Sequence, residues 1–147
     1  LRLWEMSSGR CLRTFGGEYP DSVYVTSVCL SADGCLALSG SDWGTLRLWE
    51  VASGRRLRAF QGHEESVTSV CLSNDGRLAL SGSADKTLRL WEVTGERCLR
   101  TFDGHAGRVT SVCLSSDGRL ALSGSNDKTV RLWFLDWELG DGPAPRE

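Results

Sequence analysis

The tryptophans of this chain recur at a nearly constant interval. Trp4, Trp49, Trp91 and Trp133 lie 45, 42 and 42 residues apart, and each ends a Leu-Arg-Leu-Trp or Val-Arg-Leu-Trp run. The surrounding segments also repeat, because residues 66–93 match both 24–51 and 108–135 at 22 of 28 positions. A period in the low forties is typical of repeat architectures, in which one unit cannot bury both faces of its own sheet. We therefore expect units that pack against their neighbours.

Each unit has the residue pattern of four short β-strands. In the middle unit, residues 67–73 are rich in β-branched and apolar residues and end at Asn74-Asp75-Gly76, a tight-turn signal. Further strands are predicted over 78–83, 87–93 and 98–102. The last of these is the most polar and is expected at an exposed sheet edge. No segment has helical periodicity with caps, which predicts an all-β fold of antiparallel meanders.

Three motifs at fixed offsets in these units resemble those of the WD40 repeat family, whose repeats form the blades of a β-propeller. They are a Gly-His pair ending at His63 and His105, an Asp-Gly turn after the first strand, and the terminal Trp. The usual Trp-Asp of the family is replaced by Trp-Glu at Glu50 and Glu92, and by Trp-Phe at Phe134.

The resemblance implies an incomplete ring of about three four-stranded antiparallel blades plus partial strands. We expect a propeller segment over residues 1–139, with a partial blade over 1–17 and blades over about 18–60, 61–102 and 103–139. The fourth strand of the last blade is doubtful, because residues 134–139 replace the expected Arg-Cys-Leu-Arg-Thr-Phe. Gly and Pro dominate residues 140–147, which are typical of a linker or a frayed tail.

Three blades cannot close a ring, because propellers typically have four to eight. The chain is either a stretch of a longer protein with about six or more blades, or copies associate and lend strands to one another. In the second case residues 11–15 complete the last sheet of a partner. We favour the first explanation, because the chain lacks an initiator methionine and opens inside a strand.

In the WD40 family each blade is held by a buried, hydrogen-bonded set of His, Ser or Thr, Asp and Trp. The matching positions are His63, Ser81, Asp85 and Trp91 in one unit, and His105, Ser123, Asp127 and Trp133 in the next. Such a set satisfies every polar group in a dry site and locks strand register. A His-Ser-Asp triple also occurs in hydrolases, but a nucleophile needs a pocket and an oxyanion site, and here the triple recurs in successive units. We predict structural residues, with no catalytic, cofactor-binding or metal-binding residue.

The first complete unit departs from this pattern. Gly16-Gly17-Glu18 lies where the other units carry the Gly-His pair, an insertion covers residues 19–23, and Trp43 occupies the Asp position. One interpretation makes Trp43, beside Tyr19 or Tyr24, an exposed aromatic anchor for a partner. The other interpretation, slightly favoured, has Trp43 folded inward over the vacated polar site.

Composition and charge argue against several classes of function. The net charge is −2 without a basic patch, so nucleic-acid binding is not expected. No apolar run approaches the roughly 18 residues of a membrane span. Among six cysteines, Cys29, Cys71 and Cys113 share one position in a Val-Cys-Leu run, and no close pair indicates zinc. We expect buried thiols that fill gaps between sheets, and unpaired cysteines favour the reducing cytoplasm.

The leading functional hypothesis is a non-catalytic scaffold that binds other proteins or peptides. In WD40 proteins partners commonly dock on the loop face, which by motif position carries Tyr24, Asp42, Trp43, Arg108 and Asn126. The alternative is a purely architectural segment whose only partners are further blades or copies of itself. The near-identity of the units favours this alternative, since loops tuned to one partner should differ more.

Overall fold

The computed structural model describes residues 1–16 and 23–135, whose strands form four sheets, numbered in chain order. Sheet 1 contains β1 (Arg2–Trp4) and β2 (Cys11–Thr14). Sheet 2 contains β3 (Val25–Leu30), β4 (Leu36–Ser41), β5 (Leu46–Glu50) and β6 (Arg56–Phe60). Sheet 3 contains β7 (Val67–Leu72), β8 (Leu78–Ser83), β9 (Leu88–Glu92) and β10 (Arg97–Phe102). Sheet 4 contains β11 (Val109–Leu114), β12 (Leu120–Ser125) and β13 (Val130–Phe134).

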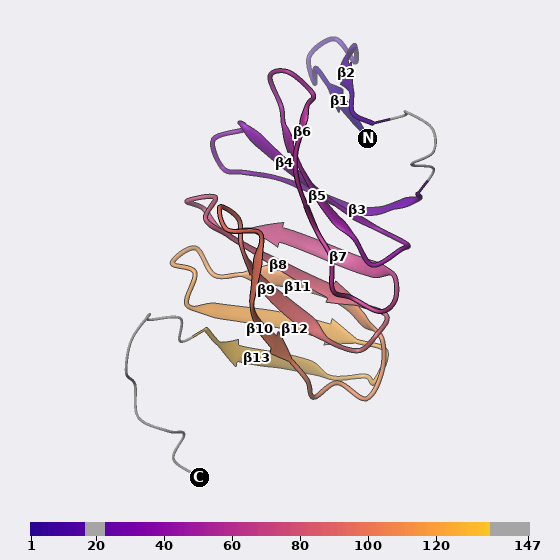
Figure 1. Cartoon of the computed structure of the whole chain (residues 1–147), viewed down its shortest axis with the longest axis vertical. Helices are drawn as coiled ribbons and strands as arrows, with labels where there is room; N and C mark the ends of the chain where they lie inside the picture. Colours follow the sequence, from indigo (N-terminus) through magenta and orange to yellow (C-terminus); the bar gives the residue numbers. More distant parts are fainter. Residues whose placement is uncertain (17–22, 136–147) are drawn as a thin grey trace.

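Within each sheet the strands pair antiparallel with their chain neighbours, as a meander requires. The register repeats, because the tryptophan of the third strand faces an alanine of the second strand in sheets 2, 3 and 4. Figure 1 shows the sheets following one another along the molecule, and the last does not return to the first. The predicted all-β, incomplete propeller is confirmed. Residues 136–139 of the doubtful strand predicted over 134–139, and the predicted tail over 140–147, lie outside the described residues.

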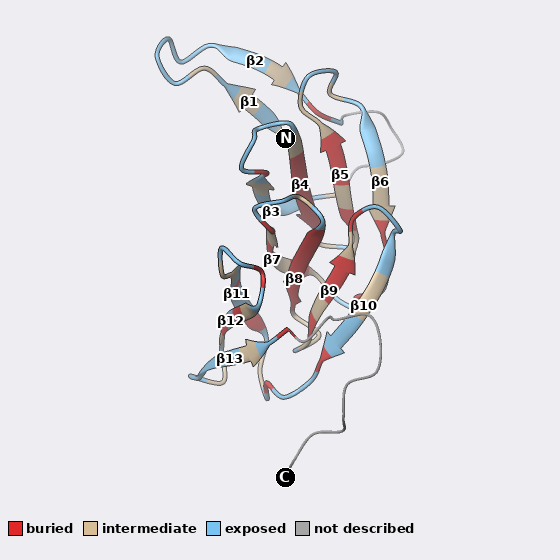
Figure 2. Cartoon of the chain, turned by 90° about the vertical axis from the view of Figure 1, so that its left-hand side faces the viewer, coloured by how far each residue is buried: buried red, intermediate tan, exposed pale blue. Residues whose placement is uncertain are grey.

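The hydrophobic core lies between consecutive sheets. Leu38, Leu46 and Leu48 of sheet 2 meet Val67, Val70, Ala79 and Trp91 of sheet 3 in one cluster. The equivalent residues of sheets 3 and 4 form a second cluster. Strands β4, β5, β8 and β9 are therefore buried on both faces, whereas β2, β6 and β10 carry many exposed residues (Figure 2). This agrees with the prediction of a polar outer strand.

Consecutive sheets approach each other closely at a glycine of the second strand. Val109 and Val112 of β11 press on Gly82 of β8, where an added Cβ would lie 2.6 Å and 2.8 Å from their Cγ1 atoms. Gly40 of β4 receives Val67 and Val70 in the same way. No larger residue fits at either glycine without moving the next sheet.

Side-chain hydrogen bonds join the first strands of consecutive sheets. The Thr68 hydroxyl donates to the carbonyl of Val109 at 2.6 Å, and the Val112 N–H donates to the Ser69 hydroxyl at 3.1 Å. The equivalent residues of β3 and β7 make the same two bonds. Each junction between complete sheets thus combines valine-on-glycine packing with the same pair of polar contacts.

The cysteine prediction holds only in part. Cys29 and Cys71 are half-buried beside the first strand of the following sheet, and burial raises the pKa of the Cys29 thiol to about 11 and that of Cys71 to about 12. Cys113 is exposed, so the prediction of a buried thiol was wrong there. In the described part of the chain, no sheet follows sheet 4 to cover it. Cys11 and Cys35 are exposed as well.

We expect Gly82→Ala to lower the free energy of unfolding by about 1–3 kcal/mol, because the new methyl group overlaps Val109 and Val112. Urea denaturation followed by tryptophan fluorescence measures this change. Gly95→Ala is the matched control, since its Cβ meets only the flexible carboxylate of Glu92, and its effect should stay within about 0.5 kcal/mol. Equal effects of the two substitutions would contradict the close approach of sheets 3 and 4.

Candidate binding rim and its supporting polar network

The four network residues of sheet 3 form one hydrogen-bonded chain. His63 Nδ1 lies 2.8 Å from Asp85 Oδ2, and His63 Nε2 lies 2.7 Å from Ser81 Oγ. The Trp91 indole N–H donates to Ser81 Oγ at 2.9 Å. His63 precedes β7, Ser81 lies in β8, Trp91 in β9, and Asp85 in the turn between β8 and β9. The network therefore ties the loop before β7 to β8, to β9 and to the turn between them.

One proton arrangement satisfies this chain of groups. Trp91 donates to Ser81, Ser81 donates to Nε2 of a neutral His63, and the Nδ1–H of His63 donates to Asp85. Burial lowers the pKa of His63 below its ordinary value, which favours the neutral ring. Burial also opposes ionisation of Asp85, but hydrogen bonds from Thr87 and His63 outweigh it and lower the pKa of this carboxyl. We therefore assign a charged carboxylate beside a neutral imidazole.

Sheet 4 holds the same network with nearly the same distances. His105 Nδ1 lies 2.7 Å from Asp127 Oδ2, and its Nε2 lies 2.7 Å from Ser123 Oγ. The Trp133 indole N–H donates to Ser123 Oγ at 2.8 Å. A hydrogen bond from the Thr129 hydroxyl is the main cause of the lowered pKa of Asp127. The structure thus brings together all eight residues proposed for the two networks.

Sequence reasoning missed a fifth member of each network. The Thr87 hydroxyl donates to Asp85 Oδ1 at 2.7 Å, and the Thr129 hydroxyl donates to Asp127 Oδ1 at 2.6 Å. The backbone N–H of each threonine donates to the same oxygen at 2.9 Å. The available signal was the Asp-Lys-Thr sequence that both units share.

The serines of these networks do not reach solvent. Ser81 is fully buried and Ser123 is 1% exposed, and the side chains of His63 and His105 are fully buried. A nucleophile must contact its substrate, so the arrangement is suited to holding strands rather than to attacking a bound molecule.

Sheet 2 keeps only one bond of the network among its described residues. The Trp49 indole N–H donates to Ser39 Oγ at 2.9 Å. Glu18, at the histidine position, lies outside the described residues, as does Tyr19. Trp43, at the aspartate position, is 75% exposed. The favoured interpretation, in which Trp43 folds inward over the polar site, was therefore wrong.

The turn between β4 and β5, which carries Trp43, packs against the next loop. An added Cβ at Gly44 would lie 2.4 Å from the carbonyl oxygen of His63 and 2.9 Å from that of Glu65. The turn is thus pressed against the loop that leads into sheet 3. The indole is much larger than the carboxylate of Asp85, and it projects into solvent instead.

The residues predicted to contact partners lie at one end of the sheets. We call this end the network rim, formed by the turns at 42–45, 84–87 and 126–129 and by residues 23–24, 61–66 and 103–108, which precede β3, β7 and β11. Asp42 N–H donates to the Tyr24 carbonyl and Tyr24 N–H donates to Asp42 Oδ1, both at 3.0 Å. Asn126 N–H donates to the Arg108 carbonyl at 2.9 Å. The structure brings each pair together, but on different sheets, with sheet 3 between them.

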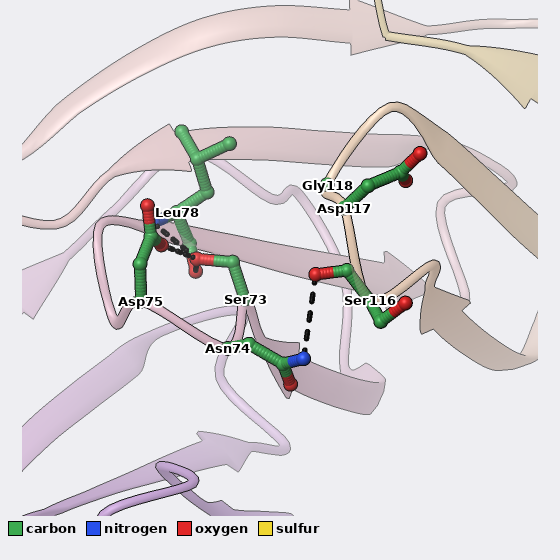
Figure 3. A pocket seen from close by; sticks show the side chains of 7 residues that line it. All are labelled: Ser73, Asn74, Asp75, Leu78, Ser116, Asp117 and Gly118. Carbon is green, nitrogen blue, oxygen red and sulfur yellow. Dashed lines mark hydrogen bonds between the residues drawn. The ribbon is translucent and has the colours of Figure 1, made fainter.

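The opposite rim carries a small depression of about 120 Å³ between the first hairpin turns of sheets 3 and 4 (Figure 3). The Asn74 side-chain amide bridges these turns by donating to the Ser116 carbonyl at 3.3 Å. Hydrogen bonds from Ser73 to Asp75 and from Ser115 to Asp117 lower the pKa of both carboxyl groups. Each carboxylate stabilises its own turn, and within the described residues no group of three His, Cys, Asp or Glu is placed to hold a metal ion.

The stacked meanders and their repeated His-Ser-Asp-Trp networks define an open segment of a β-propeller. The sequence model of the WD domain, G-beta repeat, matches residues 9–50, 54–92 and 96–133. The chain belongs to the WD40 repeat family, whose repeats generally mediate protein–protein interaction and are generally non-catalytic. A search of curated proteins found no match. Across the described residues no helix is long and apolar enough to cross a membrane.

We expect Ser81→Ala to destabilise the chain by about 2–4 kcal/mol, because it leaves both the Trp91 indole N–H and His63 Nε2 buried without a partner. Ser39→Ala is the matched control at the equivalent position of sheet 2, where Ser39 Oγ accepts from the Trp49 indole and donates to the Arg47 carbonyl at 3.5 Å, but contacts no imidazole among the described residues. Its cost should be about half as large. Urea denaturation of both variants provides the comparison, and equal losses would argue against the contribution of the histidine.

The stability of the chain should fall as the pH is lowered. The pKa of His63 is lowered in the folded state, so its contribution is present above an unfolded pKa of about 6.5 and declines below it. The lowered pKa values of Asp85 and Asp127 add a further loss below about pH 4. Urea denaturation between pH 8 and pH 4 measures the first decline. His63→Gln should reduce its slope between pH 7 and pH 5, and an unchanged slope would contradict the neutral buried ring.

Proposed function

We propose that this chain is a non-catalytic scaffold that binds another protein or a peptide at the network rim. The observation that carries the proposal is the exposure of Tyr24 and Trp43, at 79% and 75%, on this rim. Large aromatic side chains contribute much of the energy at protein interfaces, because they bury a large area while few rotatable bonds are restricted.

These aromatic residues start from a well-ordered backbone. Two hydrogen bonds between Tyr24 and Asp42 hold the backbone at both positions. Gly44, the residue after Trp43, packs against the next loop. A binding surface that is already ordered loses less conformational entropy when a partner docks. The same turn in sheets 3 and 4 carries aspartate, which is used internally by the network, so an outward aromatic is specific to sheet 2.

The far end of the rim has a different chemistry. Arg108 and Asn126 are exposed and joined through the backbone, whereas the equivalent positions of sheet 3 are the small residues Ser66 and Ala84. At these positions the rim therefore offers an aromatic pair on sheet 2, small residues on sheet 3, and a cation with an amide on sheet 4. A partner segment with an apolar anchor at one end and a carboxylate at the other fits this order.

The cytoplasm is the proposed location of this scaffold. All six cysteines are free and three of them are exposed, a state that a reducing compartment preserves.

We expect Trp43→Ala to weaken the binding of peptides selected from a random library against this chain by at least tenfold, since interface tryptophans commonly contribute about 2 kcal/mol or more. Arg108→Ala should weaken the same peptides less. Isothermal titration gives the affinities, and the melting temperature should stay nearly unchanged in both variants. Met6→Ala is the control, because Met6 is exposed in the turn between β1 and β2, away from the rim. Selected peptides that bind both rim variants at full affinity would contradict the proposal.

A further inference from the structure

The two ends of the stack of sheets expose complementary surfaces. Val25 and Val28 of β3 are 46% and 52% exposed. Val67 and Val109, the equivalents of Val25, are fully buried, and Val70 and Val112, the equivalents of Val28, are 6% and 7% exposed. At the other end, an added Cβ at Gly124 would meet only the Thr110 hydroxyl at 3.7 Å. The first end thus presents the valine pair, and the second end presents the empty glycine position that receives such a pair inside the chain.

The polar groups at these ends are complementary in the same way. Inside the chain, Thr68 donates to the carbonyl of Val109, and Ser69 accepts from the N–H of Val112. On β11 the equivalents Thr110 and Ser111 are exposed, with no following strand to meet among the described residues. The carbonyl of a second copy's Val25 and the N–H of its Val28 supply the same acceptor and donor.

The open apolar face of sheet 4 resembles the face of sheet 3 that sheet 4 itself covers. Leu80, Leu88 and Leu90 are 0–2% exposed beneath sheet 4, whereas the equivalent Leu122, Val130 and Leu132 of sheet 4 are 42%, 69% and 55% exposed. Large exposed apolar patches on a folded protein mark an interaction site. Inside the chain, sheet 3 covers the equivalent face of sheet 2. Residues 24–51 of sheet 2 match residues 66–93 of sheet 3 at 22 of 28 positions, so sheet 2 of a second copy can cover sheet 4 in the same way.

We propose that two copies of this chain join head to tail into a closed ring, in which β2 of each copy becomes the fourth strand of the other copy's sheet 4 and β3 packs on the open face of that sheet. Of the four sheets of each copy, sheet 1 is taken apart when β2 joins the other copy, which leaves sheets 2, 3 and 4. Two copies therefore make six blades, within the usual four to eight, whereas three copies would make nine. This interaction lies at the open faces of the sheets and goes beyond the partner binding proposed for the network rim.

Strand β1 is displaced when the ring closes, because it occupies the place that β13 of the other copy takes. Trp4 pairs with Cys11 and Leu3 with Arg13, as Trp91 pairs with Cys98 and Leu90 with Arg100, and both hairpins carry a bulge at the same point. β1 is therefore the equivalent of β9 and β13. It is a three-residue strand paired with β2 alone, so it exchanges for the longer β13. Sheet 4 then gains β2 as its fourth strand, as sheet 3 has β10.

The mass of the full chain in solution is the first test. Size-exclusion chromatography with light scattering should give twice the 16.1 kDa of one chain. Val28→Lys and Gly124→Leu each disrupt both joints of the ring, and each should weaken association by at least tenfold. Neither side chain is packed in the single copy, so circular dichroism and tryptophan fluorescence should remain those of the folded chain. Leu57→Lys, an equal change of charge on the outer strand β6, is the matched control and should remain dimeric.

Mixing the two variants separates a head-to-tail joint from a symmetric one. A copy with Val28→Lys retains a native Gly124, and a copy with Gly124→Leu retains a native Val28. The mixture can therefore form one undamaged joint, and a two-copy species should reappear in it although neither variant forms one alone. Failure of mixing to restore association would overturn the head-to-tail arrangement.

The thiol of Cys113 provides an independent readout. Its equivalents Cys29 and Cys71 are half-buried beside the next sheet, so the joint should cover Cys113 with the partner copy. Alkylation by iodoacetamide, followed by peptide mass spectrometry, should be at least tenfold slower at Cys113 in the wild-type chain than in Val28→Lys. Cys35, exposed in a turn of the opposite rim, is the internal reference and should react equally in both.

A chain that stays at the mass of one copy at all concentrations overturns the proposal. A three-copy species would also overturn it, as would open-ended aggregates that neither Val28→Lys nor Gly124→Leu reduces. Trp43→Ala should leave the two-copy mass unchanged, because Trp43 lies on the network rim. Failure of the ring and failure of rim binding are therefore distinguished by different variants.

Discussion

The close approach of consecutive sheets is the constraint on which the rest of this structure depends. Val109 and Val112 reach the backbone of β8 because Gly82 has no side chain, and the same contact recurs at Gly40. This contact places the leucines of β8 and β9 within a dry core between sheets 3 and 4. A single sheet of three or four short strands has two apolar faces and cannot bury both alone, so stability in this chain comes from the junctions as much as from the sheets.

The polar networks add a different kind of order to this packing. Each network links the loop before a sheet to its second and third strands through groups that water does not reach, and an unpaired member would be costly there. Sheet 2 shows the effect of replacing the aspartate. The tryptophan-to-serine bond and the sheet register persist, while the turn residue is free to point outward as Trp43. The turn position that holds a network aspartate in sheets 3 and 4 is thus occupied in sheet 2 by an exposed tryptophan on the rim.

The molecule consequently presents two kinds of surface with separate physical origins. The rim consists of turn residues whose side chains can vary without disturbing the strands beneath them, which suits recognition. The sheet faces at the two ends consist of the same residues that form the internal core, and they are exposed only because no neighbouring sheet covers them in the described part of the chain. Substitutions at one surface therefore leave the other intact.

The sequence alone determined the repeat, the four-stranded unit and the strand order, because these depend on local alternation, turn residues and fixed offsets that recur along the chain. Four of the five members of each network followed from the resemblance to the WD40 family. Thr87 was missed although Asp-Lys-Thr recurs in both units, because only the placement of the Asp85 carboxylate shows that this hydroxyl belongs to the network. The direction of Trp43 and the exposure of Cys113 were decided by tertiary structure. The turn of Trp43 packs against the next loop at Gly44, and the exposure of Cys113 depends on whether another sheet packs beside it. Neither neighbour is encoded in the residue's own unit.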